Sequence, residues 1–203
     1  IRPEATGYGT VYFAAEMLAA NGKDFKGKRV AVSGSGNVSQ YAIEKVNDLG
    51  GIPITCSDSN GTIVDESGID RAKLAFLLDL KNNRRGRIKE YADKHKVKYY
   101  EGLSVWQVIK EHGLKVDIAL PCATQNELDE SLAKALAAAG CYCVSEGANM
   151  PSDLNAIKVY QENNFLYGPA KAANAGGVAV SGLEMSQNSM RLLWSREEVD
   201  AKL

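Results

Sequence analysis

Short apolar runs alternate along this chain with longer stretches whose apolar positions recur at helical spacing. Residues 30–32 form such a run, and Val38, Ala42, Val46 and Leu49 follow at the period of a helix. A second strand is predicted to open at Ile52 and to end just before Asp58, and further strands are predicted at 99–100, 116–120, 142–145 and 165–167. Helices are predicted at 10–20, 38–49, 69–80, 88–95, 105–111, 128–139 and 174–194. Because buried strands that alternate with helices form parallel sheets, we expect an α/β fold, Rossmann-like and doubly wound, with a mostly parallel sheet and helices on both faces.

Small polar segments follow four of the predicted strands. They are residues 33–36, 57–59, 121–126 and 146–149. In a doubly wound sheet, ligands bind beyond the carboxyl ends of the parallel strands. We therefore expect these four segments to gather along one edge of the sheet and to form a ligand site there.

Gly34 and Gly36 follow the first buried strand and open a helix, and Asp58 comes 22 residues after Gly36, just past the end of the next strand. This is the layout of a dinucleotide-binding motif. One glycine makes the tight turn, the next lets the backbone approach a pyrophosphate, and the helix N-terminus offers unpaired N–H groups. The third motif position holds Ser39, which is small but is neither Gly nor Ala. The alternative is a purely structural glycine turn.

Composition sets limits on the class of protein. The 203 residues include 45% hydrophobic and 24% charged residues, with a net charge of −1. This is a globular balance that argues against a nucleic-acid partner, and no apolar run has the length of a membrane span. Cys56, Cys122, Cys141 and Cys143 lack CxxC pairs or a His at ligand spacing, so we expect buried free thiols and no metal site.

Six stretches, spread from the first residues almost to the last, are long and specific. They are RPEATGYG (2–9), SGSGNVSQYAIEK (33–45), CSDSNGTIVDESG (56–68), DIALPCATQNELD (117–129), EGANMP (146–151) and GPAKAANAGGVAVSGLEMSQN (168–188). They resemble the nucleotide domain of hexameric, NADP-type glutamate dehydrogenases of the Glu/Leu/Phe/Val dehydrogenase family. The resemblance implies reversible oxidative deamination of L-glutamate to 2-oxoglutarate and ammonia, with NADP or NAD, in a cytoplasmic homo-hexamer. It also implies that residues 1–203 are an excised dinucleotide-binding domain, separated from an N-terminal substrate domain and a C-terminal tail.

The resemblance also implies roles for individual residues. Those matching cofactor contacts are Thr6, Gly34, Ser35, Gly36, Asn37, Val38, Cys122, Ala123, Thr124, Asn149 and Asn174. Val178 and Ser181 match residues that touch the amino-acid substrate. Each has a plainer alternative: Thr6 could cap the first helix, and the two asparagines could be turn or cap residues. Gly176, Gly177 and Gly182 would each weaken a helix, which favours close approach of a ligand or another backbone there.

The residues around the second strand give opposing indications of cofactor preference. Asp58 occupies the position that often binds the ribose 2′-OH of NAD, and it would repel a 2′-phosphate by about 3 kcal/mol at ~5 Å and an effective dielectric of ~20. A basic cluster and two hydroxyls oppose it, since charge-assisted contacts contribute about 1.5–3 kcal/mol each. These residues are Ser57, Ser59, Lys81, Arg84, Arg85 and Arg87. Related NADP enzymes share the Asp and the residues matching Lys81, Arg84 and Arg87, so we expect NADP, with NAD also possible.

The chemistry of oxidative deamination needs a general base near neutral pH. In the family, a lysine and an aspartate of the other domain serve, and we find neither motif in this sequence, so no catalytic residue is assigned. We therefore expect the chain to bind cofactor and to be inactive alone. The alternatives are a non-enzymatic NAD(P)-sensing module, a dehydrogenase of another amino acid and, less favoured, a methyltransferase.

Overall fold

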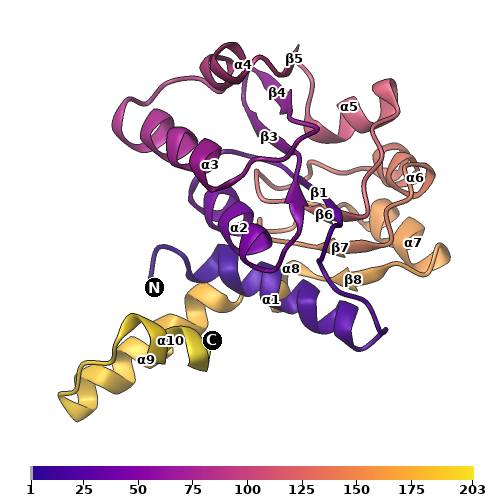
Figure 1. Cartoon of the computed structure of the whole chain (residues 1–203). Coiled ribbons are helices and arrows are strands. Elements are labelled where there is room, and N and C mark those ends of the chain that lie inside the picture. Colours follow the sequence, from indigo (N-terminus) through magenta and orange to yellow (C-terminus); the bar gives the residue numbers. More distant parts are fainter. Residues whose placement is uncertain (1) are drawn as a thin grey trace.

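The computed structural model describes residues 2–203 and contains two β-sheets (Figure 1). The larger sheet is parallel throughout, with the strand order β2-β1-β6-β7-β8. Its strands are β1 (Arg29–Val32), β2 (Ile52–Pro53), β6 (Ile118–Leu120), β7 (Cys143–Ser145) and β8 (Leu166–Gly168). The smaller sheet is antiparallel and consists of β3 (Thr55–Asp58), β4 (Gly61–Val64) and β5 (Lys98–Glu101). The prediction of a doubly wound α/β fold is confirmed.

Helices lie on both faces of the parallel sheet. They are α1 (Ala5–Ala19), α2 (Asn37–Asp48), α3 (Arg71–Leu78), α4 (Lys89–His95), α5 (Val105–His112), α6 (Glu130–Ala138), α7 (Leu154–Glu162), α8 (Ala170–Ala173), α9 (Gly176–Met190) and α10 (Arg196–Lys202). A π-helical turn, η1 (Asp79–Asn83), extends α3. Two hydrophobic cores follow from this arrangement, one on each face of the sheet.

Strand β1 shows how a short apolar run builds both cores. Val30 and Val32 point to the core that includes Leu18 of α1 and Ile43 of α2. Ala31, between them, points to the opposite core, which includes the fully buried Trp106 of α5. Successive side chains of a strand alternate between faces, so a strand covered on both sides must be apolar at every position.

The strand order places a topological switch point between β1 and β6. From β1 the chain crosses through α2 to β2 on one side, and β6 lies on the other side of β1. The loops after β1 and β6 therefore leave the sheet in diverging directions and open a crevice at its carboxyl edge.

The region after α2 differs from its prediction. The single strand expected from Ile52 to just before Asp58 is divided into β2, which ends at Pro53, and β3, whose last residue is Asp58. Strand β4 was missed, whereas the strand at 99–100 is confirmed within β5. The Asp58 carboxylate accepts a hydrogen bond from the Asn60 backbone N–H at 2.9 Å, which forms the tight turn that folds β4 back on β3.

Helix α1 begins five residues earlier than predicted because packing overrides the low helix propensity of Gly7 and Gly9. A Cβ at Gly7 would lie 2.6 Å from the backbone oxygen of Val38 on α2. A Cβ at Gly176 would collide with the backbone oxygen of Ala5. The expectation that glycines of the last long helix permit close approach of another backbone is thus confirmed at Gly176. That helix is shorter than the predicted 174–194, and α8 precedes it separately.

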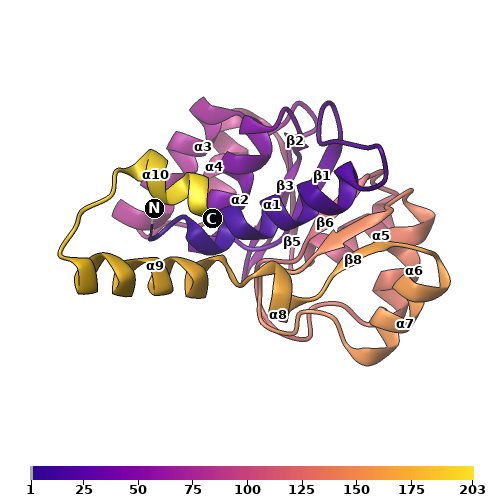
Figure 2. The ribbon, with the colours of Figure 1, turned by 90° about the horizontal axis from the view of Figure 1, so that it is seen from below.

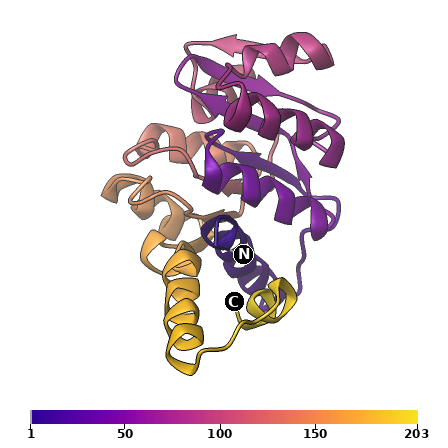
Figure 3. The same cartoon turned by 90° about the vertical axis from the view of Figure 1, so that its left-hand side faces the viewer.

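The end of the chain extends from the sheet and then returns (Figures 2 and 3). Helix α9 projects from the body, and α10 lies back beside α1. The Tyr12 hydroxyl donates to the Asp200 carboxylate at 2.9 Å, and the Arg196 guanidinium pairs with Glu4. Between residues 2 and 203, no helix combines the length and apolarity that a bilayer crossing requires.

Candidate functional site

Two adjoining clefts lie at the carboxyl edge of the parallel sheet. The first, of about 660 Å³, contains the glycine turn and the tip of β3, and we call it the turn cleft. The second, of about 600 Å³, lies between the start of α1 and the start of α9, and we call it the α9 cleft. The two clefts share four lining residues, which are Val38, Cys122, Ala123 and Thr124. The four polar segments singled out in the sequence all contribute to this edge, as expected.

The glycine turn presents an open helix N-terminus to the turn cleft. Gly34 has a φ of +84°, which favours glycine, and its N–H donates to the Ser57 hydroxyl at 2.7 Å. Gly36 is the N-cap of α2, and no side chain of the described residues caps this helix. Asp or Ser side chains cap α3, α5, α6, α7 and α10, whereas α1, α4, α8 and α9, like α2, have no side-chain cap from residues 2–203. What distinguishes α2 is that its first residues line the turn cleft beside the glycine turn, where an anion is the ligand that free amides suit.

Open space lies beside Gly36, as a pyrophosphate would require. A Cβ built there would have no atom of the described chain within 4 Å. The Ser39 hydroxyl, in the first turn of α2, is buried without a hydrogen-bond partner among the described residues. The cradle and the uncapped amides fit the diphosphate of a dinucleotide.

Glu127, which sequence reasoning missed, fixes the loop that separates the two clefts. One carboxylate oxygen accepts hydrogen bonds from the Ala123 and Thr124 backbone N–H groups at 3.2 and 3.3 Å. The other oxygen accepts from the Trp106 indole N–H at 2.7 Å. Burial raises the pKa of Glu127 even though the hydrogen bonds, including one with Ser33, favour the charged form. Only the fold brings α5 beside this loop, so no local pattern marks Glu127.

Asp58 lines the turn cleft, but its carboxylate is already engaged. One oxygen accepts from the Asn60 N–H and the other from the Ile88 N–H at 3.1 Å. Its side chain is only 6% exposed, and the Lys81 ammonium lies 4.0 Å away. Asp58 thus joins the β3–β4 turn to the start of α4, which leaves it less available to a ribose hydroxyl than its position in the motif indicates.

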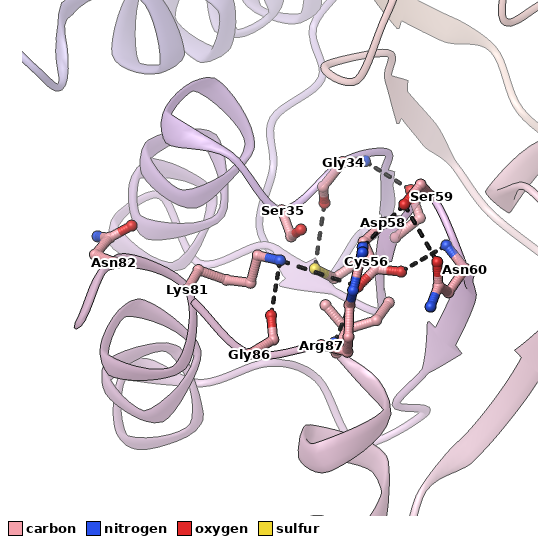
Figure 4. A network of polar contacts seen from close by, with 12 residues as sticks. Gly34, Ser35, Cys56, Asp58, Ser59, Asn60, Lys81, Asn82, Gly86 and Arg87 are labelled. Carbon is pink, nitrogen blue, oxygen red and sulfur yellow. Dashed lines mark hydrogen bonds and ion pairs between the residues drawn. The ribbon is translucent and has the colours of Figure 1, made fainter. Parts of the chain in front are cut away.

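Neither Lys81 nor Arg87 lines either cleft, but each lies next to a residue that does (Figure 4). Arg87 donates to the hydroxyl of Ser59, a lining residue of the turn cleft, at 2.9 Å. The Lys81 ammonium donates to the Gly86 backbone oxygen at 3.0 Å beside Asp58. Arg84 has other partners.

Arg84 is held outside the lining of both clefts. Its guanidinium pairs with the Asp79 carboxylate at 2.9 Å and with Glu90 at 3.3 Å, and it stacks over the Phe76 ring at 5.0 Å. Asp79 and Glu90 thus hold the Arg84 guanidinium, whereas Arg87 contacts Ser59 of the turn cleft, and the predicted cofactor contact of Arg84 stays a prediction.

The α9 cleft gathers the remaining predicted residues. The Asn174 side-chain amide donates to the Asn149 side-chain oxygen at 2.9 Å and to the Ala148 backbone oxygen at 3.4 Å. Thr6, Val178 and Ser181 also line this cleft. They are joined by Arg2, which was missed and which donates to the Gly177 backbone oxygen at 2.6 Å.

Two of the plainer alternatives can be compared with the structure. Thr6 lies inside α1, whose N-cap is Glu4, so it does not cap that helix. Asn174 is the C-cap residue of α8 and also donates across to the loop of Asn149, so its cap position coexists with a place in the cleft.

The cysteines and possible metal ligands add no further centre. All four cysteines are buried free thiols, as expected. Burial raises the pKa of each, to about 12 for Cys56 and Cys143. Among residues 2–203, no group of three or more His, Cys, Asp or Glu side chains could hold a metal ion.

The five-stranded order and the crevice between β1 and β6 define a Rossmann-type, doubly wound α/β domain. Many protein families share this fold, and the sequence identifies which one this chain belongs to. The chain belongs to the Glutamate/Leucine/Phenylalanine/Valine dehydrogenase family, whose model matches residues 1–203.

Relatives of known name cover the whole chain. It is 62% identical over 203 residues to the NAD(P)-specific glutamate dehydrogenase of Xylanibacter ruminicola and 56% identical to the NADP-specific glutamate dehydrogenase of Escherichia coli K12. Each match covers 100% of this chain and 44% of the relative. In structure it is similar to Plasmodium falciparum glutamate dehydrogenase 2, with a TM-score of 0.94 and 49% identity, over 100% of this chain and 43% of that one. The chain thus spans less than half the length of these relatives.

Proposed function

We propose that residues 1–203 form the NADP-binding domain of a glutamate dehydrogenase. The observation that carries the proposal is the uncapped N-terminus of α2, which opens beside Gly36 into a cleft continuous with a second cleft. A dinucleotide needs two connected subsites with an anion-binding helix N-terminus between them. Family membership and the names of the relatives supply the reaction: reversible oxidative deamination of L-glutamate to 2-oxoglutarate and ammonia.

The cofactor would lie across both clefts, with its diphosphate at the start of α2. The adenosine end would occupy the turn cleft, and the nicotinamide end the α9 cleft. The residues proposed to contact it are Thr6, Gly34, Ser35, Gly36, Asn37, Val38, Asp58, Ser59, Lys81, Arg87, Cys122, Ala123, Thr124, Asn149 and Asn174. Arg84 would take part only after leaving Asp79 and Glu90.

NADP is the favoured cofactor because the edge of the turn cleft at Ser59 is basic. Arg87 already donates to the Ser59 hydroxyl, and the Asp58 carboxylate is occupied by backbone N–H groups. A 2′-phosphate would accept from the guanidinium and the hydroxyl while meeting a carboxylate whose oxygens are directed elsewhere. NADP-specific enzymes among the relatives support this choice, and the NAD(P)-specific relative keeps NAD as a second cofactor.

Val178 and Ser181 are proposed to contact the amino-acid substrate. Val178 is 76% exposed on α9 at the edge of its cleft, and the Ser181 hydroxyl donates to the Gly177 backbone oxygen at 3.0 Å. When bound, the cofactor would accept or return a hydride at this cleft. The chain's own part would be to orient it, and we assign no general base to these residues. The proposal includes a cytoplasmic homo-hexamer with neither a nucleic-acid nor a membrane partner.

Three measurements test the proposal. Calorimetric titration of the 203-residue chain should show binding of NADPH and no binding of S-adenosylmethionine; the reverse would indicate a methyltransferase. The chain alone should give no NADPH-dependent amination of 2-oxoglutarate. A longer protein containing it should act on glutamate in preference to leucine, and a preference for leucine would indicate another amino-acid dehydrogenase of the family.

A further inference from the structure

Gln40 and Asn82 form a reciprocal pair of side-chain amides next to the glycine turn, outside the lining of the turn cleft. The Gln40 amide N–H donates to the Asn82 side-chain oxygen at 3.1 Å, and the Asn82 amide donates back to the Gln40 oxygen at 3.1 Å. Gln40 lies in the first turns of α2 and is 1% exposed, whereas Asn82 lies in η1. The pair therefore joins two elements that are 42 residues apart in sequence.

The glycine turn fixes the orientation of this pair. The Gln40 amide N–H also donates to the Ser35 backbone oxygen at 2.8 Å. A flipped Gln40 would direct its oxygen at that carbonyl, so only one orientation of Gln40 is allowed. With Gln40 in this orientation, Asn82 must direct its side-chain oxygen at the Gln40 amide nitrogen and its amide N–H at the Gln40 side-chain oxygen. The position of Ser35 is thus transmitted to η1.

Three consecutive residues of η1 are each held to a different part of the protein. Leu80 is fully buried in the core. The Lys81 ammonium donates to the Gly86 backbone oxygen and lies 4.0 Å from the Asp58 carboxylate. Asn82 holds the side nearest α2. Figure 4 shows Lys81 extended toward Gly86 and Asp58, with Asn82 on the other side of the segment. The π turn supplies the extra residue that allows these directions in succession.

We infer that the Gln40–Asn82 pair is a positioning element that sets the preference for NADPH over NADH. The inference rests on the proposed function. The pair couples the turn that would hold the diphosphate to the segment that carries Lys81 toward Asp58 and, a few residues on, Arg87 to Ser59. Without the Asn82 amide, η1 keeps its Leu80 anchor but loses the contact that sets its distance from the glycine turn.

The decisive experiment measures the dissociation constants of NADPH and NADH for the 203-residue chain and for its Asn82→Ala variant, by fluorescence of the reduced nicotinamide. Loss of one neutral hydrogen-bonding side chain should weaken NADPH binding about three- to tenfold. NADH binding should change less than about twofold. A second variant, Asn82→Ser, should behave in the same way.

Asn83→Ala is the matched control. Asn83 is the next residue of η1, and its amide donates to the Asp79 carboxylate at 3.0 Å, away from the cleft. This variant should bind both cofactors as the unaltered chain does. Gln40→Met keeps the volume of the buried side chain and removes its hydrogen bonds to both Ser35 and Asn82, so binding of both cofactors should weaken, and that of NADPH more.

The outcomes separate this inference from the proposed function. If the unaltered chain binds NADPH and Asn82→Ala leaves the ratio of the two dissociation constants unchanged, the positioning role is refuted while the proposed function stands. The positioning role is also refuted if Asn83→Ala lowers the ratio of the NADH to the NADPH dissociation constant as much as Asn82→Ala does. If the unaltered chain binds neither cofactor, both proposals fail.

Discussion

Substitution of Gly36 by alanine should separate the cofactor site from the stability of the fold. Gly36 has φ −84° and ψ −168°, a conformation that alanine adopts without strain. No atom of the described chain lies within 4 Å of the added Cβ. Alanine is a poorer N-cap than glycine, which lowers the free energy of unfolding by up to about 1 kcal/mol. Alanine also lowers the entropy of the unfolded chain, which raises the free energy of unfolding by about 0.4–1 kcal/mol. The free energy of unfolding should therefore change by less than about 1 kcal/mol.

The same methyl group would occupy the space that a diphosphate needs. If it displaces the diphosphate from one α2 amide, the charge-assisted hydrogen bond lost contributes about 1.5–3 kcal/mol, which corresponds to about 10- to 150-fold in the dissociation constant. Fluorescence titration with NADPH measures the affinity, and urea unfolding measures the stability. Gly36→Ala should lose affinity for NADPH and keep its stability against urea.

Two other glycines serve as references for Gly36→Ala. Gly34→Ala should lose stability as well as affinity, because Gly34 has a φ of +84° and its Cβ would lie 2.7 Å from the Ser39 hydroxyl. Gly182→Ala, in the open interior of α9, should gain up to about 1 kcal/mol of stability and bind NADPH unchanged. Undiminished NADPH affinity in a folded Gly36→Ala protein would refute the placement of the diphosphate.

Three further predictions concern charged side chains. Arg87→Ala should weaken NADPH binding about tenfold and leave NADH binding unchanged in parallel titrations, and an equal loss for both would contradict a 2′-phosphate role. Glu127→Leu should weaken both cofactors, because the Ala123 and Thr124 N–H groups lose their acceptor; selective loss of one cofactor would count against this. Asp65 is buried, which raises its pKa, but hydrogen bonds from Lys73, Ser67 and Tyr91 lower it below the ordinary value overall. The ionised Asp65 carboxylate therefore stabilises the fold above about pH 4, and this stabilisation is lost as pH falls through its lowered pKa. In Asp65→Asn, the free energy of unfolding from urea titrations should fall less steeply at acid pH, and an unchanged pH dependence would refute this role.

Local patterns were sufficient to predict the central βαβ unit. The apolar run of β1, the two glycines and the spacing of α2 are all consecutive in sequence, and the parallel topology then places the loops after β1 and β6 together. The start of α1 could not be predicted in this way. Gly7 and Gly9 disfavour a helix locally, and only the close crossing of α1 with α2 and α9 explains them.

Side-chain partners from distant segments were also beyond local patterns. Arg84 and Arg87 are equivalent as charges in sequence, but Asp79 and Glu90 hold the first while Ser59 holds the second. Glu127 resembles any exposed glutamate near a helix start until α5 places an indole against it. Tertiary contacts therefore decide which charged residues reach the cleft.

Amide NMR of the isotope-labelled 203-residue chain during titration with NADPH tests the central claim most directly. The account predicts saturable shifts largest at Gly36, Asn37 and Val38, with a second group at Ser59 and Arg87 that NADH does not reproduce. If NADPH saturates the chain while the amides at the start of α2 stay unshifted, the diphosphate is not held there and the account is contradicted.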